Sequence, residues 1–293
     1  MAKLEGVLTA MVTPFAEDGS VDVAAARRLA RHLVEHGSHG VVVAGTTGES
    51  PTLSDSEDVE LVRAVKEEIG ADAVVICGTG TNDTRHSEHL TGAAVEAGAD
   101  AVLVVTPYYN KPNRSGILAH YEAVAAAADG TPLIVYNIPS RVVVNIDPGL
   151  LAELSRIDNV VAVKQANNDE IDAVEGLDVL AGNDDIFLRC LEAGGNGGIL
   201  VASHVVGAEM RAIYDAVRAG DMDKAREIDA GIRPVYDALA VTTNPIPVKA
   251  AAEMLELIPS ARMRLPMVEA DDEQRATIRA ALAARGMLTA SAA

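Results

Sequence analysis

The stretch NVVAVKQANND, residues 159–169, ends a short apolar run with a lysine. A run this short, rich in β-branched residues and bounded by polar ones, is typical of a buried strand in a parallel sheet. Lys164 is an unusual end for such a strand, because its ammonium must reach water or a partner. The fold must therefore bury the strand and still give this side chain a partner or a function.

Seven other apolar runs resemble residues 160–164 and alternate with amphipathic, alanine-rich stretches. This alternation, at a spacing of about 30 residues, indicates parallel strands joined by crossover helices. Eight such units predict an α/β fold, the (β/α)8 TIM barrel. We expect strands at 6–12, 41–44, 73–77, 101–105, 132–136, 160–164, 178–181 and 198–202, and helices at 22–36, 55–70, 83–97, 114–128, 147–155, 168–175, 184–193 and 204–219.

The C-terminal part of the chain departs from this alternation. It holds helical stretches near 222–239, 245–256 and 271–285, and the prolines of NPIPVK separate the first two. We therefore expect a catalytic barrel over residues 1–221 and a C-terminal helical extension over residues 222–293 that packs on the barrel.

The composition argues against several classes of protein. The net charge of −19 disfavours nucleic-acid binding, which needs Lys and Arg to neutralise phosphates. No apolar run approaches the roughly 18 residues of a membrane span, and residues 1–15 lack a signal-peptide pattern. Cys77 and Cys190 lie far apart in apolar surroundings, so we expect buried, reduced thiols in a cytoplasmic protein.

Chemically useful residues follow the predicted strands, at the end of the barrel where active sites of this fold form. GTTGES (45–50) follows the second strand, TPYYNKP (106–112) the fourth and YNIPSR (136–141) the fifth, while Lys164 ends the sixth. A lysine whose stem lies in an apolar wall is more easily neutral, and a neutral amine is a nucleophile.

Phenols and anion-binding groups gather at the same rim. Three of the six tyrosines, Tyr108, Tyr109 and Tyr136, fall there, and a phenol can carry protons between substrate and solvent. The hydroxyls and backbone N–H groups of residues 45–50 could hold one carboxylate, and Arg141 could clamp a second.

Each of these residues has a structural alternative. Lys164 could pair with a carboxylate or reach solvent, Tyr108 and Tyr109 could pack at a subunit interface, and Arg141 could be a surface arginine. The glycine loop could be an ordinary turn.

The histidines do not indicate a metal site. His32 and His36, and His86 and His89, have the spacing of one helical face, but no third ligand is evident. There is also no phosphate-binding or dinucleotide fingerprint. We expect neither a metal nor an organic cofactor.

The motifs GTTGES, TPYYNKP, YNIPSR and AGND, with the strand-ending Lys164, occur in the order found in the dihydrodipicolinate synthase family. The chain resembles that family over nearly its whole length, including NPIPVKAA in the helical tail. The family belongs to the pyruvate-dependent lyases and aldolases that include N-acetylneuraminate lyase. The resemblance implies condensation of pyruvate with L-aspartate 4-semialdehyde to 4-hydroxy-tetrahydrodipicolinate, in lysine and diaminopimelate biosynthesis.

The resemblance also implies the catalytic residues. Lys164 would form a Schiff base with pyruvate, and Thr47, Tyr136 and Tyr109 would relay protons. Tyr109 would come from a neighbouring subunit of a homotetramer built from two tight dimers.

The substrate-binding residues are implied in the same way. Thr46 and Thr47 would bind the pyruvate carboxylate, and Arg141 would bind the carboxylate of the semialdehyde. Gly182 and Ile199 would line the pyruvate pocket through their backbones.

The chain departs from the family pattern at two places. Residues 142–144 are VVV where many relatives have Thr-Gly, which could shift the loop that carries Arg141. Asp55 and Asp58 stand where lysine-inhibited members often carry histidines, and His86 replaces a frequent glutamate. Asn82 and Tyr108 of the same site remain, but the differences argue against inhibition by lysine.

Two other functions compete with the synthase. A related pyruvate-dependent aldolase, of the 2-keto-3-deoxy sugar acid or N-acetylneuraminate type, would share Lys164 and Tyr136 but recognise a polyol, whereas Arg141 favours a second short acid. A non-catalytic barrel would bind pyruvate without a covalent adduct. The intact set of Lys164, Tyr136, Tyr109 and Thr47 disfavours this second alternative.

Overall fold

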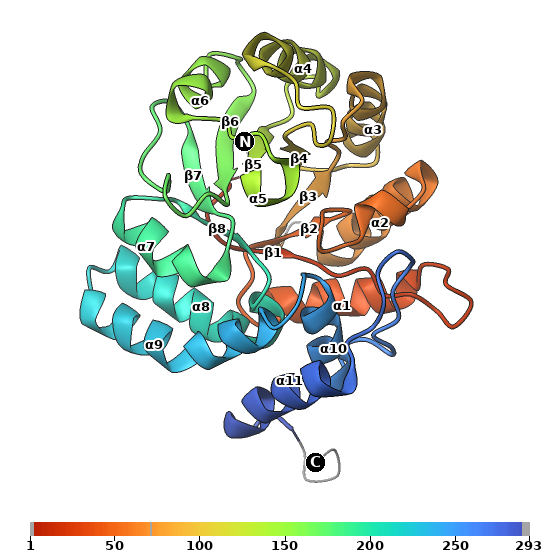
Figure 1. Ribbon diagram of the computed structural model, residues 1–293, viewed down its shortest axis with the longest axis vertical. Coiled ribbons are helices and arrows are strands. Elements are labelled where there is room, and N and C mark those ends of the chain that lie inside the picture. Colours follow the sequence, from red (N-terminus) through yellow and green to blue (C-terminus); the bar gives the residue numbers. More distant parts are fainter. Residues whose placement is uncertain (1–2, 71, 289–293) are drawn as a thin grey trace.

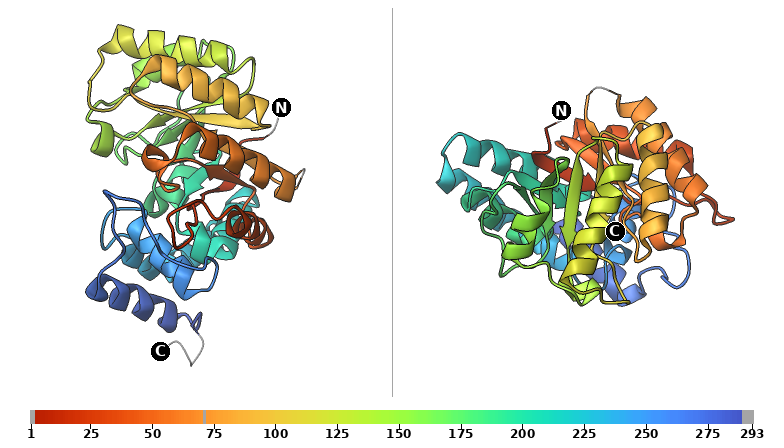
Figure 2. Two further views of the ribbon diagram at one scale, coloured as in Figure 1. Left: turned by 90° about the vertical axis from the view of Figure 1, so that its right-hand side faces the viewer. Right: turned by 90° about the horizontal axis from the view of Figure 1, so that it is seen from above.

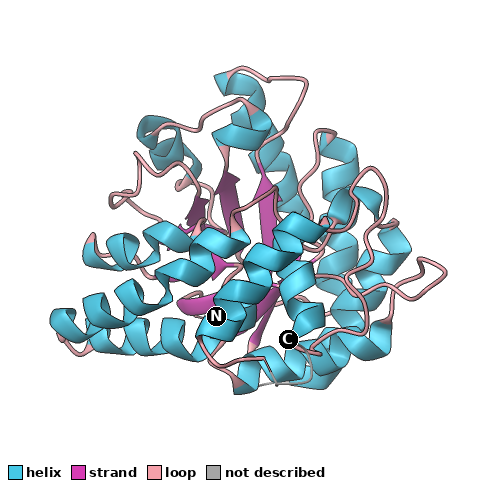
Figure 3. Ribbon diagram, turned by 60° about the horizontal axis from the view of Figure 1, so that its bottom comes forward, coloured by secondary structure: helices cyan, strands magenta, loops and turns pink. Residues whose placement is uncertain are grey.

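The computed structural model describes residues 3–70 and 72–288 and confirms the predicted (β/α)8 barrel. Eight parallel strands follow one another around the barrel in chain order, and β8 closes it against β1 (Figure 1). Helices surround the strands (Figure 3). The strands are β1 (Gly6–Ala10), β2 (Gly40–Val43), β3 (Val74–Gly78), β4 (Ala101–Val105), β5 (Leu133–Asn137), β6 (Val160–Gln165), β7 (Asp178–Ala181) and β8 (Gly197–Leu200).

The helices of the barrel begin and end within a few residues of the predicted bounds, with two exceptions described below. Within the described ranges, no helix combines the length and apolarity needed to cross a bilayer. The helices are α1 (Val23–Glu35), η1 (Ser50–Thr52), α2 (Asp55–Ile69), α3 (Thr84–Glu96), α4 (Arg114–Ala127), α5 (Pro139–Val142), α6 (Pro148–Leu154), η2 (Asp184–Ile186), α7 (Phe187–Glu192) and α8 (Ser203–Arg218).

Many of these helices have an aspartate, asparagine or serine at the N-cap position. In α2, Ser54 and Glu57 form a capping box, in which each side chain bonds the other residue's backbone N–H. Asp, Asn or Ser side chains likewise accept a backbone N–H at the start of α1, α2, α3, α4 and α6, and at the start of two helices of the C-terminal extension. Part of the large negative charge thus lies at helix N-termini, where it is stabilising.

The helix predicted over residues 168–175 is absent, so this prediction was wrong. The backbone N–H of Asn167 donates to Gln165 Oε1 at 3.0 Å, and that of Asp169 donates to Asn167 Oδ1 at 3.3 Å. Short polar side chains that bond nearby backbone groups compete with helix formation. The connection between β6 and β7 is therefore an irregular loop. The second exception is a pair of short helices that the sequence did not predict, η1 and α5.

The buried side chains form two layers separated by the barrel wall. Leu133 and Val135 of β5 belong to the outer layer, against the helices. Ile134 and Tyr136 belong to the inner layer, as the period-two alternation of a strand requires. Lys164 of β6 is the register partner of Tyr136 and lies on the same inner side, at the end of the barrel where the strands finish.

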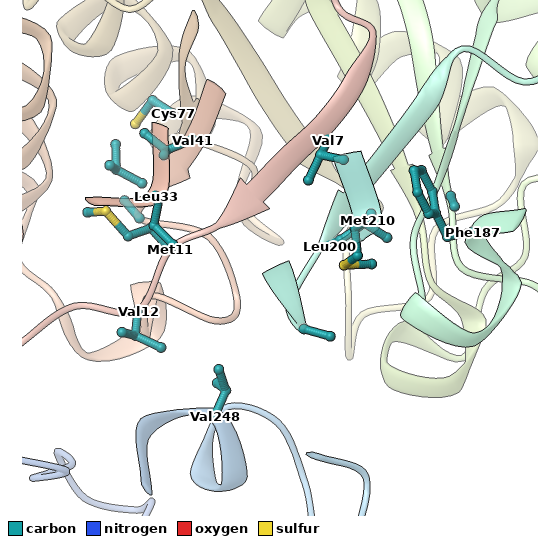
Figure 4. Close-up of a cluster of buried hydrophobic side chains, with 14 of the residues drawn as sticks. Val7, Met11, Val12, Leu33, Val41, Cys77, Phe187, Leu200, Met210 and Val248 are labelled. Atoms are coloured by element: carbon teal, nitrogen blue, oxygen red, sulfur yellow. The ribbon is translucent and has the colours of Figure 1, made fainter. Parts of the chain in front are cut away.

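Three further helices form the C-terminal extension: α9 (Met222–Leu239), α10 (Ile246–Met254) and α11 (Asp272–Ala284). α9 packs along α8, and α11 contacts α9 and α10 at one end of the molecule (Figures 1 and 2). Val248 of α10 belongs to the same buried cluster as Val12, and Figure 4 shows it pointing toward the segment after β1. The predicted division between residues 221 and 222 falls in the turn before α9, and its status as a domain boundary stays a prediction.

Candidate functional site

A cavity of about 510 Å³ opens where the strands end. Its wall combines residues from the loops that follow the barrel strands with residues of α9 and of the segment before α10. Six predicted site residues line it together: Thr46, Thr47, Tyr136, Arg141, Lys164 and Gly182.

Lys164 is held beside the ring of Tyr136 within this cavity. Lys164 is only 5% exposed, and its Nζ lies 4.1 Å from the centroid of the Tyr136 ring. Such a contact partly compensates an ammonium for lost water. Across the described part of the chain, no carboxylate oxygen lies within 4.0 Å of this ammonium. The described residues therefore form no ion pair with Lys164, and the charge of Asp184 in the same cavity acts on it from a longer distance.

Two other lysines show what a structural lysine of this protein looks like. Lys66 contacts both carboxylate oxygens of Asp100 at 2.7 Å. Lys249, fully buried, lies 2.5 Å from Glu49 Oε1. Lys164 has burial like that of Lys249 without its carboxylate, which leaves its amine available to a molecule in the cavity.

The threonine loop, residues 45–50, forms a tight turn after β2. Thr47 is buried, and its Oγ1 accepts a hydrogen bond from Asn244 Nδ2 at 3.0 Å. Thr13 Oγ1 donates to the Gly48 carbonyl at 2.7 Å. Glu49 adopts a left-handed conformation with φ of 60°. The loop is thus fixed by contacts from the segment after β1, from its own turn and from the C-terminal extension.

Arg141 reaches the same cavity from the short helix α5. Its Nη2 donates to the Asn244 carbonyl at 3.0 Å and contacts Thr243 Oγ1 at 3.4 Å. Val143, at the end of α5, has φ of 69°, a conformation that a β-branched residue rarely adopts. A glycine would adopt this conformation more easily, so the VVV sequence strains the turn after Arg141.

Two predicted site residues do not line this cavity. Tyr109 has φ of 69° and is 89% exposed to solvent, outside the wall of the cavity. Ile199 is fully buried in the inner layer of the barrel, together with Tyr136.

Sequence reasoning missed three polar residues of the cavity. Asp184 accepts the N–H groups of Val201 and Ala202 at 2.8 and 3.0 Å, and burial raises the pKa of its carboxyl to about 6. Tyr236 of α9 has a buried hydroxyl without a hydrogen-bond partner in the described structure, and burial raises the pKa of this phenol. Asn244 is the third. Asp184 lies within the AGND motif, but only the fold could bring Tyr236 and Asn244 to the barrel mouth.

Comparisons with known proteins show the family to which the chain belongs. Residues 3–285 match the family model described as the dihydrodipicolinate synthetase family. The chain is 45% identical to the 4-hydroxy-tetrahydrodipicolinate synthase of Moorella thermoacetica, over 96% of this chain and 98% of that relative. It is similar to the crystal structure of dihydrodipicolinate synthase from Thermotoga maritima, with a TM-score of 0.93, 39% identity and coverage of 97% and 99% of the two chains. A structure of the Cyanidioschyzon merolae synthase with lysine bound gives a TM-score of 0.93, 37% identity and the same two coverages.

A second cavity, of about 400 Å³, adjoins the first and shares Thr46 and Arg141 with it. Its acidic side contains Asp55 and Asp58, and His86 Nε2 lies 2.9 Å from Asp55 Oδ1.

The histidines that the sequence analysis did not assign to a metal site make local contacts of this kind. The described residues contain no group of three or more potential metal ligands. The absence of lysine inhibition stays a prediction.

Asp58 makes the stability of the protein depend on pH. Its residue is only 6% exposed, and its Oδ1 has no hydrogen-bond partner among the described residues. Burial, together with the charges of Asp55 and Glu57, raises the pKa of the Asp58 carboxyl to about 7. A raised pKa in the folded state means that stability is lost as pH rises from about 4 to about 7.

We therefore expect Asp58→Asn to stabilise the protein at pH 8 by about 1–3 kcal/mol and to have a smaller effect at pH 5, because the variant never has to bury a charge. Urea unfolding at the two pH values measures the difference. Glu60→Gln, an exposed carboxylate on the same helix, is the control. Equal effects of Asp58→Asn at both pH values would contradict the prediction.

Proposed function

The chain belongs to the dihydrodipicolinate synthetase family, and we propose that it condenses pyruvate with L-aspartate 4-semialdehyde to 4-hydroxy-tetrahydrodipicolinate. The observation that carries the proposal is Lys164, buried at the end of β6 beside Tyr136 and without a carboxylate partner. The other residues of the cavity supply the groups that two short acids would need, namely hydroxyls, backbone N–H groups and one guanidinium.

The first half of the reaction forms an enamine on Lys164. The Nζ attacks the carbonyl carbon of pyruvate, and loss of water gives an iminium. This iminium withdraws electrons, so the adjacent methyl group releases a proton and becomes a carbon nucleophile. Tyr136, whose ring centroid lies 4.1 Å from Lys164 Nζ, and Thr47, which lines the same cavity, would transfer protons in these steps.

The second half joins the two substrates. The enamine carbon attacks the aldehyde carbon of the semialdehyde, and the aldehyde oxygen takes up a proton. The amine of the semialdehyde then attacks the iminium carbon, which closes the ring and releases the Lys164 amine. In this scheme Thr46 and Thr47 bind the pyruvate carboxylate, Gly182 and Ile199 shape the pocket through their backbones, and Arg141 binds the second carboxylate.

The proposal includes a homotetramer made of two tight dimers. Tyr109 supports it, because an exposed tyrosine in a left-handed turn is poorly placed for its own cavity and well placed to enter a neighbour's. The barrel of residues 1–221 would carry the Schiff-base chemistry, with residues 222–293 as an extension. The buried free thiols of Cys77 and Cys190 suit a reducing cytoplasm, which we propose as the location.

The Schiff base is tested by borohydride reduction with pyruvate, followed by peptide mass spectrometry. We expect a pyruvate-derived adduct on Lys164 alone, and Lys164→Ala should lose this adduct and at least about 10³-fold of the turnover. Lys111→Ala, which removes a different lysine near the rim, should keep both. An adduct elsewhere, or none, would support the non-catalytic barrel instead.

Arg141 decides which aldehyde is used. We expect Arg141→Met to lower kcat/KM for the semialdehyde about 10- to 100-fold, because a charge-assisted contact to its carboxylate is lost. The yield of the reduced pyruvate adduct should stay unchanged. Arg114→Met, on the surface ion pair with Glu153, serves as the control. Better turnover of a sugar-derived aldehyde than of the semialdehyde would favour the related aldolase.

Subunit exchange tests whether Tyr109 serves a neighbour. We expect Tyr109→Phe to lower kcat about 10²-fold while the oligomer is retained. When this variant is mixed with Lys164→Ala, each mixed dimer regains one complete site, and about a quarter of wild-type activity should return after random exchange. Sedimentation velocity follows the assembly. Absence of recovery, with mixed dimers present, would place Tyr109 in its own subunit's site.

A further inference from the structure

A second lysine, Lys249 of α10, is fully buried next to the site although it lies outside the barrel. Its Nζ contacts Glu49 Oε1 at 2.5 Å and the Arg262 carbonyl at 2.6 Å, and it stands 4.1 Å from the ring centroid of Phe15. Glu49 is equally buried and also accepts the backbone N–H of Arg264 at 3.0 Å. Both charges are therefore removed from water and fully engaged.

This pair joins the C-terminal extension to the threonine loop. Glu49 belongs to that loop, and its N–H donates to the Thr46 carbonyl at 3.1 Å. Any movement of Glu49 therefore moves the turn that presents Thr46 and Thr47. Asn244, at the start of the same segment of the extension, donates to Thr47 Oγ1. The extension thus holds both ends of the short run from Thr47 to Glu49.

Stability alone gives no good reason for such a pair. Moving two charges out of water costs about as much as their attraction returns, and apolar residues of similar volume often stabilise a core equally well. A buried pair of opposite charges does fix geometry, because each group can be satisfied only in one arrangement. The position of the pair, two residues from Thr47, makes the loop the part that it fixes.

We propose that the Lys249–Glu49 pair, together with Asn244, is a positioning device that holds Thr46 and Thr47 for binding the substrate carboxylate, so that the extension is part of the active site. The inference rests on the proposed function, since it assumes that this loop binds pyruvate. Lys249 and Glu49 act through the loop and do not touch the substrate.

Four variants test the device: Lys249→Met, Glu49→Gln, the double variant Lys249→Met/Glu49→Gln, and Asn244→Ala. Each single change within the pair leaves an unpaired buried charge and should lower Tm, whereas the double variant should recover Tm because neither charge remains. Asn244 is half-buried, so Asn244→Ala should fold and separates the loop contact from the buried charges. Arg275→Met, which breaks the ion pair with Glu253 elsewhere in the extension, is the matched control.

Pyruvate KM and kcat are measured for folded protein, with the reduced Lys164 adduct as a second readout. The device predicts that KM for pyruvate stays raised about tenfold in the double variant and in Asn244→Ala, with a smaller change in kcat, because a displaced binding loop loses affinity. Arg275→Met should leave KM within about twofold of wild type, even if Tm falls.

A purely structural pair would behave differently. In that case the double variant, with its Tm recovered, would have the wild-type KM for pyruvate. Asn244→Ala would also leave KM unchanged. This result would overturn the inference. If the double variant does not fold, Asn244→Ala decides alone. Failure of the proposed function is distinct, because wild-type protein would then form no adduct with pyruvate.

Discussion

Closure of the parallel barrel is the constraint on which the rest of the structure depends. Because every strand is paired on both sides, alternate side chains must point either into the barrel or toward the helices. At the ends of β5 and β6 the inner positions are Tyr136 and Lys164, which are register partners. Apolar side chains such as Ile134 and Ile199 fill the interior below them. The amine can therefore project only toward the mouth, into the cavity.

The two buried lysines show how one side chain can serve opposite purposes. Lys249 is compensated by a carboxylate, a carbonyl and an aromatic ring, and it is fixed in place. Lys164 has the aromatic ring without the carboxylate. A lysine has three hydrogen-bonding protons when charged and a lone pair when neutral, so an incompletely engaged lysine at a cavity retains capacity for a substrate. Burial alone does not distinguish Lys164 from Lys249, whereas the groups that contact each ammonium do.

Sequence periodicity could predict the barrel because each strand and helix carries its own apolar pattern. Position at a strand end was then enough to select Lys164 and Tyr136. The pattern failed at residues 168–175, where side-chain bonds to the backbone replace a helix. It also could not find Tyr236, Asn244 or Lys249, since the extension has no repeating order and its approach to the barrel mouth is a tertiary contact between residues about 200 positions apart.

The negative charge of the chain limits how an anionic substrate can be attracted to the site. A net charge of −19 does not attract anionic substrates from a distance. In the proposed reaction one carboxylate is bound largely by neutral hydroxyls and N–H groups, whose attraction is short-ranged and directional. Recognition of this kind depends on where Thr46 and Thr47 stand, and errors of about 1 Å are costly. A loop that binds a carboxylate through directional hydrogen bonds must be held in place on both of its sides. The barrel supplies one side, and the buried pair in the extension supplies the other.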